Sequence, residues 1–127
     1  MSNRVNFNKS GSLFPSGAQA IGTTYSADQQ NLNRRGVVAT VAVSVDNTGG
    51  TLTVTIQGKD PASGTYYDIL TSAGLNVAAG LISLRVYPGI AAVTNRSVSD
   101  ILPATWRLKF VVASAAITAT VGACEVV

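Results

Sequence analysis

The sequence predicts an all-β fold, a β-sandwich or jelly roll preceded by an extended N-terminal arm. Several stretches alternate apolar and polar residues with a period of two, which is typical of half-buried strands. Short runs of Gly, Pro, Asn and Asp separate these stretches. No stretch has the length and the apolar spacing of a long helix. Because one sheet alone would leave its apolar face in water, six or seven such strands indicate two packed sheets.

Length and composition fit one domain after the arm. The chain has 127 residues, which is enough to bury a core without disulfides or metal ions. We expect the arm in residues 1–17 and the sandwich in residues 18–127. The arm is polar, and its only apolar cluster is Leu13, Phe14 and Pro15. Such a segment is either disordered or extended along another surface, where Leu13 and Phe14 would anchor it.

The strongest strand signal lies in residues 36–60, after a short first strand in residues 18–26 and a polar connection in residues 27–35. Apolar residues occupy every second position in both halves of this stretch. They are Val37, Ala39, Val41, Val43 and Val45 in the first half, and Leu52, Val54 and Ile56 in the second. Residues 46–50 between the halves are Asp-Asn-Thr-Gly-Gly, which accept the positive φ of a tight reversal. We therefore predict one long β-hairpin.

The middle of the chain continues the strand pattern. Residues 60–64 form a turn of Asp, Pro and Gly, and residues 66–70 a third strand. Residues 71–80 remain open between a loop and a single helical turn. Residues 81–87 alternate again, which predicts another strand. The polar residues 89–103 then form a longer crossing from one sheet to the other.

A second hairpin is predicted in residues 106–123. Its first half places a row of large apolar residues on one face, and its second half does the same with smaller ones. These residues are Trp106, Leu108, Phe110 and Val112, followed by Ile117, Ala119, Val121 and Ala123. Trp106 lies on the core parity of its strand, so we expect it to fill the sandwich interior.

The side-chain chemistry argues against catalysis. The chain has no His, which removes the commonest general base and the commonest metal ligand. Its single Cys, Cys124, cannot form a thiol–imidazole pair or a closed zinc site, and we expect a buried or half-buried thiol in the last strand. No glycine motif for phosphate binding is present. We therefore expect no enzyme activity, no cofactor and no metal site.

Charge and hydropathy exclude two further classes of partner. The net charge of +3 is spread along the chain, whereas nucleic-acid binding needs Lys and Arg gathered on one face. No apolar run approaches the length of a membrane span, and the first residues lack a secretory signal. We expect neither nucleic acid nor membrane as a partner, and synthesis in a cytoplasm. Charged residues make up only 12% of the chain, which is a hint of assembly with neighbours.

Two parts of the chain supply candidate partner-binding residues. The arm contains Arg4 and Lys9 and no acidic residue, which suits an acidic partner. In the third strand, adjacent Tyr66 and Tyr67 must point to opposite faces, so one of them should be exposed. Asp68 beside them would face a partner or a sugar, although a solvent-facing strand residue is the simpler interpretation. The full candidate set is Arg4, Phe7, Lys9, Leu13, Phe14, Tyr66, Tyr67 and Asp68.

Four segments resemble small β-rich structural proteins of tailed bacteriophages. They are TVTIQGKDPASGTYYDIL, LRVYPG, LPATWRLKFVV and TATVGACEVV, in this order, and the similarity spans roughly residues 35–127. The VYPG run, residues 86–89, and the LPATWR run, residues 102–107, are its most specific parts. The resemblance implies structural roles for both runs, with Pro88 and Gly89 turning a corner and Trp106 filling the core.

The resemblance also implies a function in the virion. Together with the arm and the sandwich layout, the resemblance indicates a head decoration, or cement, protein, located on the capsid surface and made in the cytoplasm of the bacterial host. The expected partners are the major capsid protein and copies of the chain itself, arranged as a trimer. One alternative is a tail or fibre module that binds a glycan or receptor through its exposed tyrosines and Asp68. Another is a tail or head-completion subunit.

Overall fold

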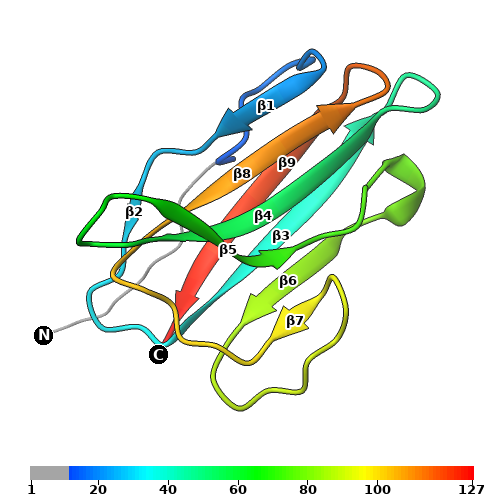
Figure 1. The fold of residues 1–127 in the computed structure, drawn as a ribbon. Helices are drawn as coiled ribbons and strands as arrows, with labels where there is room; N and C mark the ends of the chain where they lie inside the picture. Colours follow the sequence, from blue (N-terminus) through cyan, green and yellow to red (C-terminus); the bar gives the residue numbers. More distant parts are fainter. Residues whose placement is uncertain (1–11) are drawn as a thin grey trace, which may run out of the picture.

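The computed structural model describes residues 12–127 and shows an all-β sandwich of two sheets (Figure 1). The arm residues Arg4, Phe7 and Lys9 lie outside the described residues. The first sheet has the order β1–β8–β4–β5, with β2 also paired to β8. Its strands are β1 (Gly22–Tyr25), β2 (Gln29–Gln30), β4 (Thr51–Lys59), β5 (Tyr66–Thr71) and β8 (Thr105–Ala113).

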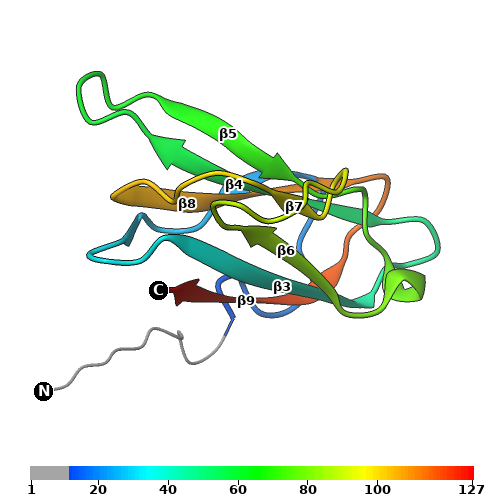
Figure 2. The same ribbon diagram turned by 90° about the horizontal axis from the view of Figure 1, so that it is seen from below.

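The second sheet packs against the first and has the order β7–β6–β3–β9 (Figure 2). Its strands are β3 (Gly36–Val45), β6 (Ile82–Val86), β7 (Ser97–Val98) and β9 (Thr118–Val126). Neighbouring strands are antiparallel except β6 and β7, which are parallel. The predicted crossing in residues 89–103 does connect the two sheets, since it joins β6 to β8 through β7.

Both predicted hairpins are wrong in their pairing, although their strands are correctly placed. β3 and β4 lie in different sheets, and so do β8 and β9. Each pair is therefore an arch that crosses from one sheet to the other. The two arches lie side by side, because β4 pairs with β8 along one sheet and β3 pairs with β9 along the other. Alternation of apolar residues fixes which face of a strand is buried, but strands that face each other across a core alternate in the same way as paired strands.

The first arch turns at residues 46–50, where three consecutive residues have positive φ. The φ angles of Asn47, Thr48 and Gly49 are 50°, 58° and 134°. Gly50 N donates to Asp46 O at 2.8 Å, and Thr48 N donates to Asp46 Oδ1 at 3.1 Å. The turn chemistry is thus as predicted, but it joins two sheets instead of two paired strands.

The remaining elements agree with the sequence. β4 and β5 form a true hairpin around residues 60–65, with a register shift between Ile56 and Gln57. The open stretch 71–80 contains a single 3₁₀ turn, η1 (Val77–Ala79), in which Asn76 Oδ1 accepts from Ala79 N at 3.2 Å. The strand predicted in residues 81–87 is β6.

The core lies between the sheets, and Trp106, Phe14 and Phe110 are its largest fully buried side chains. Trp106 is 2% exposed, as predicted, and its Nε1 donates to Glu125 Oε2 at 2.8 Å. Cys124 is half-buried in β9, as expected.

The structure corrects the predicted C-terminal limit of the arm. Phe14 is 2% exposed, and its ring meets that of Phe110 edge-on at a centroid distance of 5.0 Å. Leu13 N donates to Val121 O at 2.7 Å, and Ser12 Oγ accepts from Val121 N at 2.8 Å. These bonds cover part of the free edge of β9 and bring Phe14 into the core. Phe14 is therefore a core residue of its own chain and not an anchor on another surface, and half-buried Leu13 packs beside it.

Candidate partner-binding face

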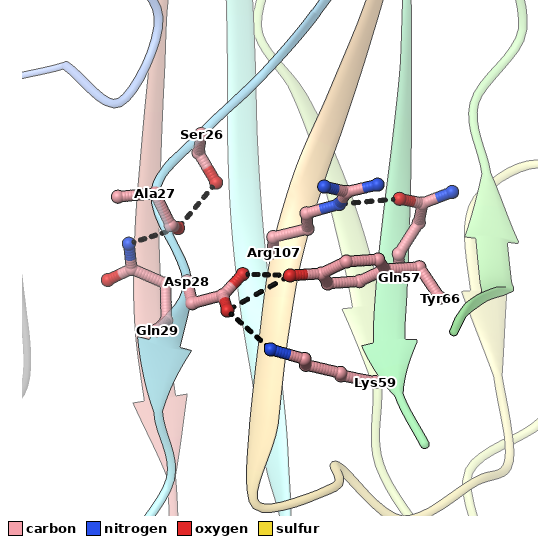
Figure 3. Close-up of polar contacts among 8 residues, drawn as sticks. All are labelled: Ser26, Ala27, Asp28, Gln29, Gln57, Lys59, Tyr66 and Arg107. Carbon is pink, nitrogen blue, oxygen red and sulfur yellow. Dashed lines mark hydrogen bonds and ion pairs between the residues drawn. The ribbon is translucent and has the colours of Figure 1, made fainter. Parts of the chain in front are cut away.

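Polar and aromatic side chains from β4, β5 and β8 and from the segment between β1 and β2 converge on the outer face of the first sheet (Figure 3). In β4 and β8 they alternate with core residues: Gln57 with Ile56 in β4, and Arg107 with Leu108 in β8. Successive side chains of a strand point to opposite faces, so Gln57 and Arg107 point outward together. We call the set the Arg107 cluster. It consists of Tyr25, Asp28, Gln57, Lys59, Tyr66, Asp68 and Arg107.

The Arg107 guanidinium is the centre of the cluster. Its Cζ lies 3.4 Å from the ring centroid of Tyr66 and 3.9 Å from that of Tyr25. Both distances allow a favourable cation–π interaction. Arg107 Nε also donates to Gln57 Oε1 at 2.9 Å. The guanidinium is therefore fixed by two rings and one hydrogen bond, although it is only half-buried.

A second hydrogen bond extends this arrangement to β5. Gln57 Nε2 donates to Asp68 Oδ1 at 2.8 Å, and Gln57 and Asp68 are cross-strand neighbours. Asp68 is exposed, in agreement with the simpler interpretation of its position. Its carboxylate nevertheless has a defined orientation, because the Gln57 amide is held from the other side by Arg107.

Asp28 closes the opposite side of the cluster. Tyr66 Oη donates to Asp28 Oδ1 at 2.8 Å and to Oδ2 at 3.0 Å, and Lys59 Nζ lies 3.4 Å from Oδ2 (Figure 3). The Tyr66 hydrogen bond is the largest cause of the lowered pKa of Asp28. Burial, the next largest effect, raises this pKa, and the Lys59 hydrogen bond and the charges of Lys59 and Arg107 lower it further. The hydrogen bond to Asp28 in turn raises the pKa of Lys59.

The backbone around Asp28 is held by its neighbours between β1 and β2. Ser26 Oγ donates to Ala27 O at 3.0 Å and accepts from Leu108 N at 2.9 Å. Gln29 is buried, and its Nε2 donates to Ala27 O at 2.9 Å. These bonds attach the segment to β8, so Asp28 is presented to Tyr66 and Lys59 from a fixed position (Figure 3).

Tyr67 lies on the opposite face from Tyr66 and is 46% exposed, as the prediction of one exposed tyrosine required. A Cβ on Gly58 would come within 2.6 Å of the Tyr67 ring and 2.8 Å of Pro103, so only glycine lets this ring lie across β4. The ring borders an open hollow of about 670 Å³, which we call the Tyr67 hollow. Its lining residues are Lys59, Asp60, Pro61, Tyr67, Pro103, Ala104 and Thr105.

The structure thus brings together two of the predicted residues, Tyr66 and Asp68, and separates Tyr67 from them. Sequence reasoning missed the other five members of the cluster, which are Tyr25, Asp28, Gln57, Lys59 and Arg107. The outward direction of Arg107 could have been predicted, because every second residue of its strand, starting with Trp106, is apolar and buried. This pattern went unused because β8 was assigned to a hairpin with the final strand instead of to the sheet that contains β4 and β5.

Within residues 12–127, no three His, Cys, Asp or Glu side chains are grouped closely enough to hold a metal ion. The described helical structure contains nothing long and apolar enough to cross a membrane. The cluster contains two cationic and two anionic side chains next to two aromatic rings, an arrangement suited to non-covalent binding. No protein-family model, curated protein sequence or solved structure matches the chain.

Proposed function

We propose that this protein is a structural component of a tailed-bacteriophage virion, a capsid decoration protein that binds the outer face of the major capsid shell. The observation that most supports a binding function is the prearranged contact of Arg107 with Tyr25 and Tyr66. Arg and Tyr are enriched among the residues that dominate protein–protein binding energy. The virion location is supported by the resemblance of residues 35–127 to phage structural proteins.

The order of the Arg107 cluster favours binding. A flexible Arg or Lys side chain loses conformational entropy when a partner fixes it, which weakens association. In this cluster the guanidinium, the Gln57 amide and the Asp28 carboxylate are already held by intramolecular hydrogen bonds. A partner therefore meets a surface close to its bound form.

Such a protein acts mechanically. Each copy would bury about 1,000 Å² or more at an interface of ordinary size. Many identical copies across the joints between capsid subunits would then resist internal pressure by their summed contacts. This mode of action requires no catalytic group.

The experiment measures binding of the purified chain to capsids that lack it. We expect Arg107→Ala to weaken binding by about 30-fold or more, the effect of losing one dominant interface residue. Arg85→Ala is the matched control, because Arg85 is exposed on β6 in the other sheet. Equal weakening by both variants would argue against this face, and failure of the wild-type chain to bind capsids would refute the decoration function.

For the glycan-binding alternative, the contacts of Tyr66 and Asp68 favour Tyr67 as the ring that would bind. Tyr66 is covered by Arg107 and bound to Asp28, and Asp68 is bound to Gln57, so the three predicted residues do not form one platform. Tyr67 retains an exposed ring beside a hollow. Glycan-array binding that Tyr67→Ala abolishes and Tyr66→Ala preserves would favour this alternative over decoration.

A further inference from the structure

We propose that one end of the sandwich is a self-association surface, in which Leu32 of one copy inserts into the Tyr67 hollow of a second copy. Figures 1 and 2 show that the loop between β2 and β3, the β4–β5 turn and the segment before β8 lie at the same end as the C terminus. We call this region the loop end. The inference gives a location to the self-association expected of a decoration protein, but its test needs no capsid.

Leu32 is a protruding apolar side chain on a rigid loop. It is 86% exposed, which is more than any other large apolar residue of the described chain. Hydrogen bonds nevertheless hold the backbone of this loop, because Asn31 Nδ2 donates to Arg34 O at 2.9 Å and to Leu102 O at 3.0 Å. Arg34 N donates back to Asn31 Oδ1 at 2.8 Å. Leu32 is thus held in solvent by a fixed backbone, at an energetic disadvantage that a partner surface would remove.

The Tyr67 hollow has the shape and chemistry to receive such a side chain. Its volume of about 670 Å³ exceeds that of a leucine side chain, and Tyr67, Pro61, Pro103 and Ala104 give it apolar walls. The hydrogen bond from Asn31 to Leu102 O connects the Leu32 loop to the segment that forms one wall. The protruding residue and the hollow therefore keep a fixed relation within one copy, which a repeating contact between copies requires.

Further groups at the loop end support a second copy as the occupant. Ile101 is 65% exposed in the segment that leads into Pro103, one of the lining residues of the hollow. Arg35 is exposed three residues after Leu32, whereas Asp60 lines the hollow with its carboxylate bonded to Ser63 Oγ and Ala62 N. Lys59 also lines the hollow, but its Nζ is paired with Asp28. Insertion of Leu32 would bring Arg35 of one copy towards Asp60 of the next, so charge favours the same contact as shape.

The experiment measures molar mass against concentration, by sedimentation equilibrium of the full chain without capsids. We expect the wild-type chain to associate, and Leu32→Ser to raise the dissociation constant by about 30-fold. Tyr67→Ala should weaken association similarly, and Arg35→Glu by a smaller factor. Leu81→Ser is the matched control, because Leu81 is a 71% exposed leucine away from the loop end, and it should leave association unchanged.

Several results would overturn the inference. One is a wild-type chain that remains monomeric throughout the accessible concentrations, and another is an equal effect of Leu32→Ser and Leu81→Ser. A glycan or peptide that binds the hollow, is lost in Tyr67→Ala and leaves the molar mass unchanged would assign the hollow to another ligand. Capsid binding is measured separately, so a wild-type chain that binds capsids but remains monomeric in solution refutes this inference and leaves the proposed function intact.

Discussion

At Phe14, one side chain joins the start of the described chain to the core. Phe14 is buried against Phe110, between the two sheets. We expect Phe14→Ala to lower the free energy of unfolding by about 3–5 kcal/mol, because it removes a large buried ring and leaves a cavity. Urea denaturation measures this change. Pro15→Ala, at the exposed neighbouring position, should change stability by less than about 0.5 kcal/mol, and equal effects would contradict the core assignment.

Asp28 gives a prediction for the titration of the Arg107 cluster. The hydrogen bond from Tyr66 is the largest cause of its lowered pKa, so NMR titration of the carboxyl carbon should give a value below 3.8. Tyr66→Phe removes the donor and should raise this pKa. The contribution of the pair to stability is present above the unfolded-state pKa and is lost as the pH falls through the folded-state pKa. An unchanged titration in Tyr66→Phe would contradict the assigned cause.

A substitution at Gly58 tests whether the position of the Tyr67 ring depends on the missing side chain. In Gly58→Ala the new methyl group would overlap the ring and Pro103, so we expect the ring to shift and stability to fall by about 1–3 kcal/mol. Chemical shifts of the Tyr67 ring and urea denaturation measure the two effects. Gly74→Ala is the control, because its methyl group would meet Thr51 at an ordinary 3.5 Å. If both variants behave alike, the close contact at Gly58 has no special role.

At the scale of the elements, the sequence predicts the strands well and their partners poorly. Alternation located β3, β4, β8 and β9 correctly, because each has one buried apolar face. It could not show that β3 faces β4 across the core, since the arch and the hairpin bury the same residues. The choice between them depends on the direction in which residues 46–50 leave the first sheet, and a single sequence does not encode that direction in any simple pattern.

The arch turn itself contains an unfavourable residue. Thr48 has a φ of 58°, which a β-branched side chain rarely adopts, whereas Asn tolerates this conformation. We expect Thr48→Asn to raise the free energy of unfolding by about 0.5–1 kcal/mol, with the hydrogen bond from the backbone N–H of this residue to Asp46 Oδ1 preserved. Denaturant unfolding compares it with Thr53→Asn, in the middle of β4, which should be neutral or destabilising. A loss of stability in Thr48→Asn would show that the threonine methyl group contributes packing that outweighs the strain.

At the scale of the whole molecule, the candidate site follows from the sheet order. Tyr25, Gln57, Tyr66 and Arg107 belong to four strands that become neighbours only because β8 pairs with both β1 and β4. The sequence separates Tyr25 from Arg107 by most of the chain length. Sequence analysis could therefore name Tyr66 and Asp68 as exposed candidates, but it could not find the guanidinium that orders them.

The boundary between arm and sandwich decides how the contribution of the arm to capsid binding can be measured. Deletion of residues 2–17 would remove Phe14 from the core, so loss of binding in that variant would report unfolding as much as lost contacts.

Deletion of residues 2–11 keeps Ser12, Leu13 and Phe14 on β9 and in the core. If Arg4, Phe7 and Lys9 bind the shell, the shorter deletion should reduce capsid occupancy, while the midpoint of urea denaturation stays close to that of the full chain. The longer deletion should lower both, by at least the effect of Phe14→Ala on stability. Unchanged occupancy after the shorter deletion would assign capsid binding to the sandwich alone and leave the Arg107 cluster as its principal contact.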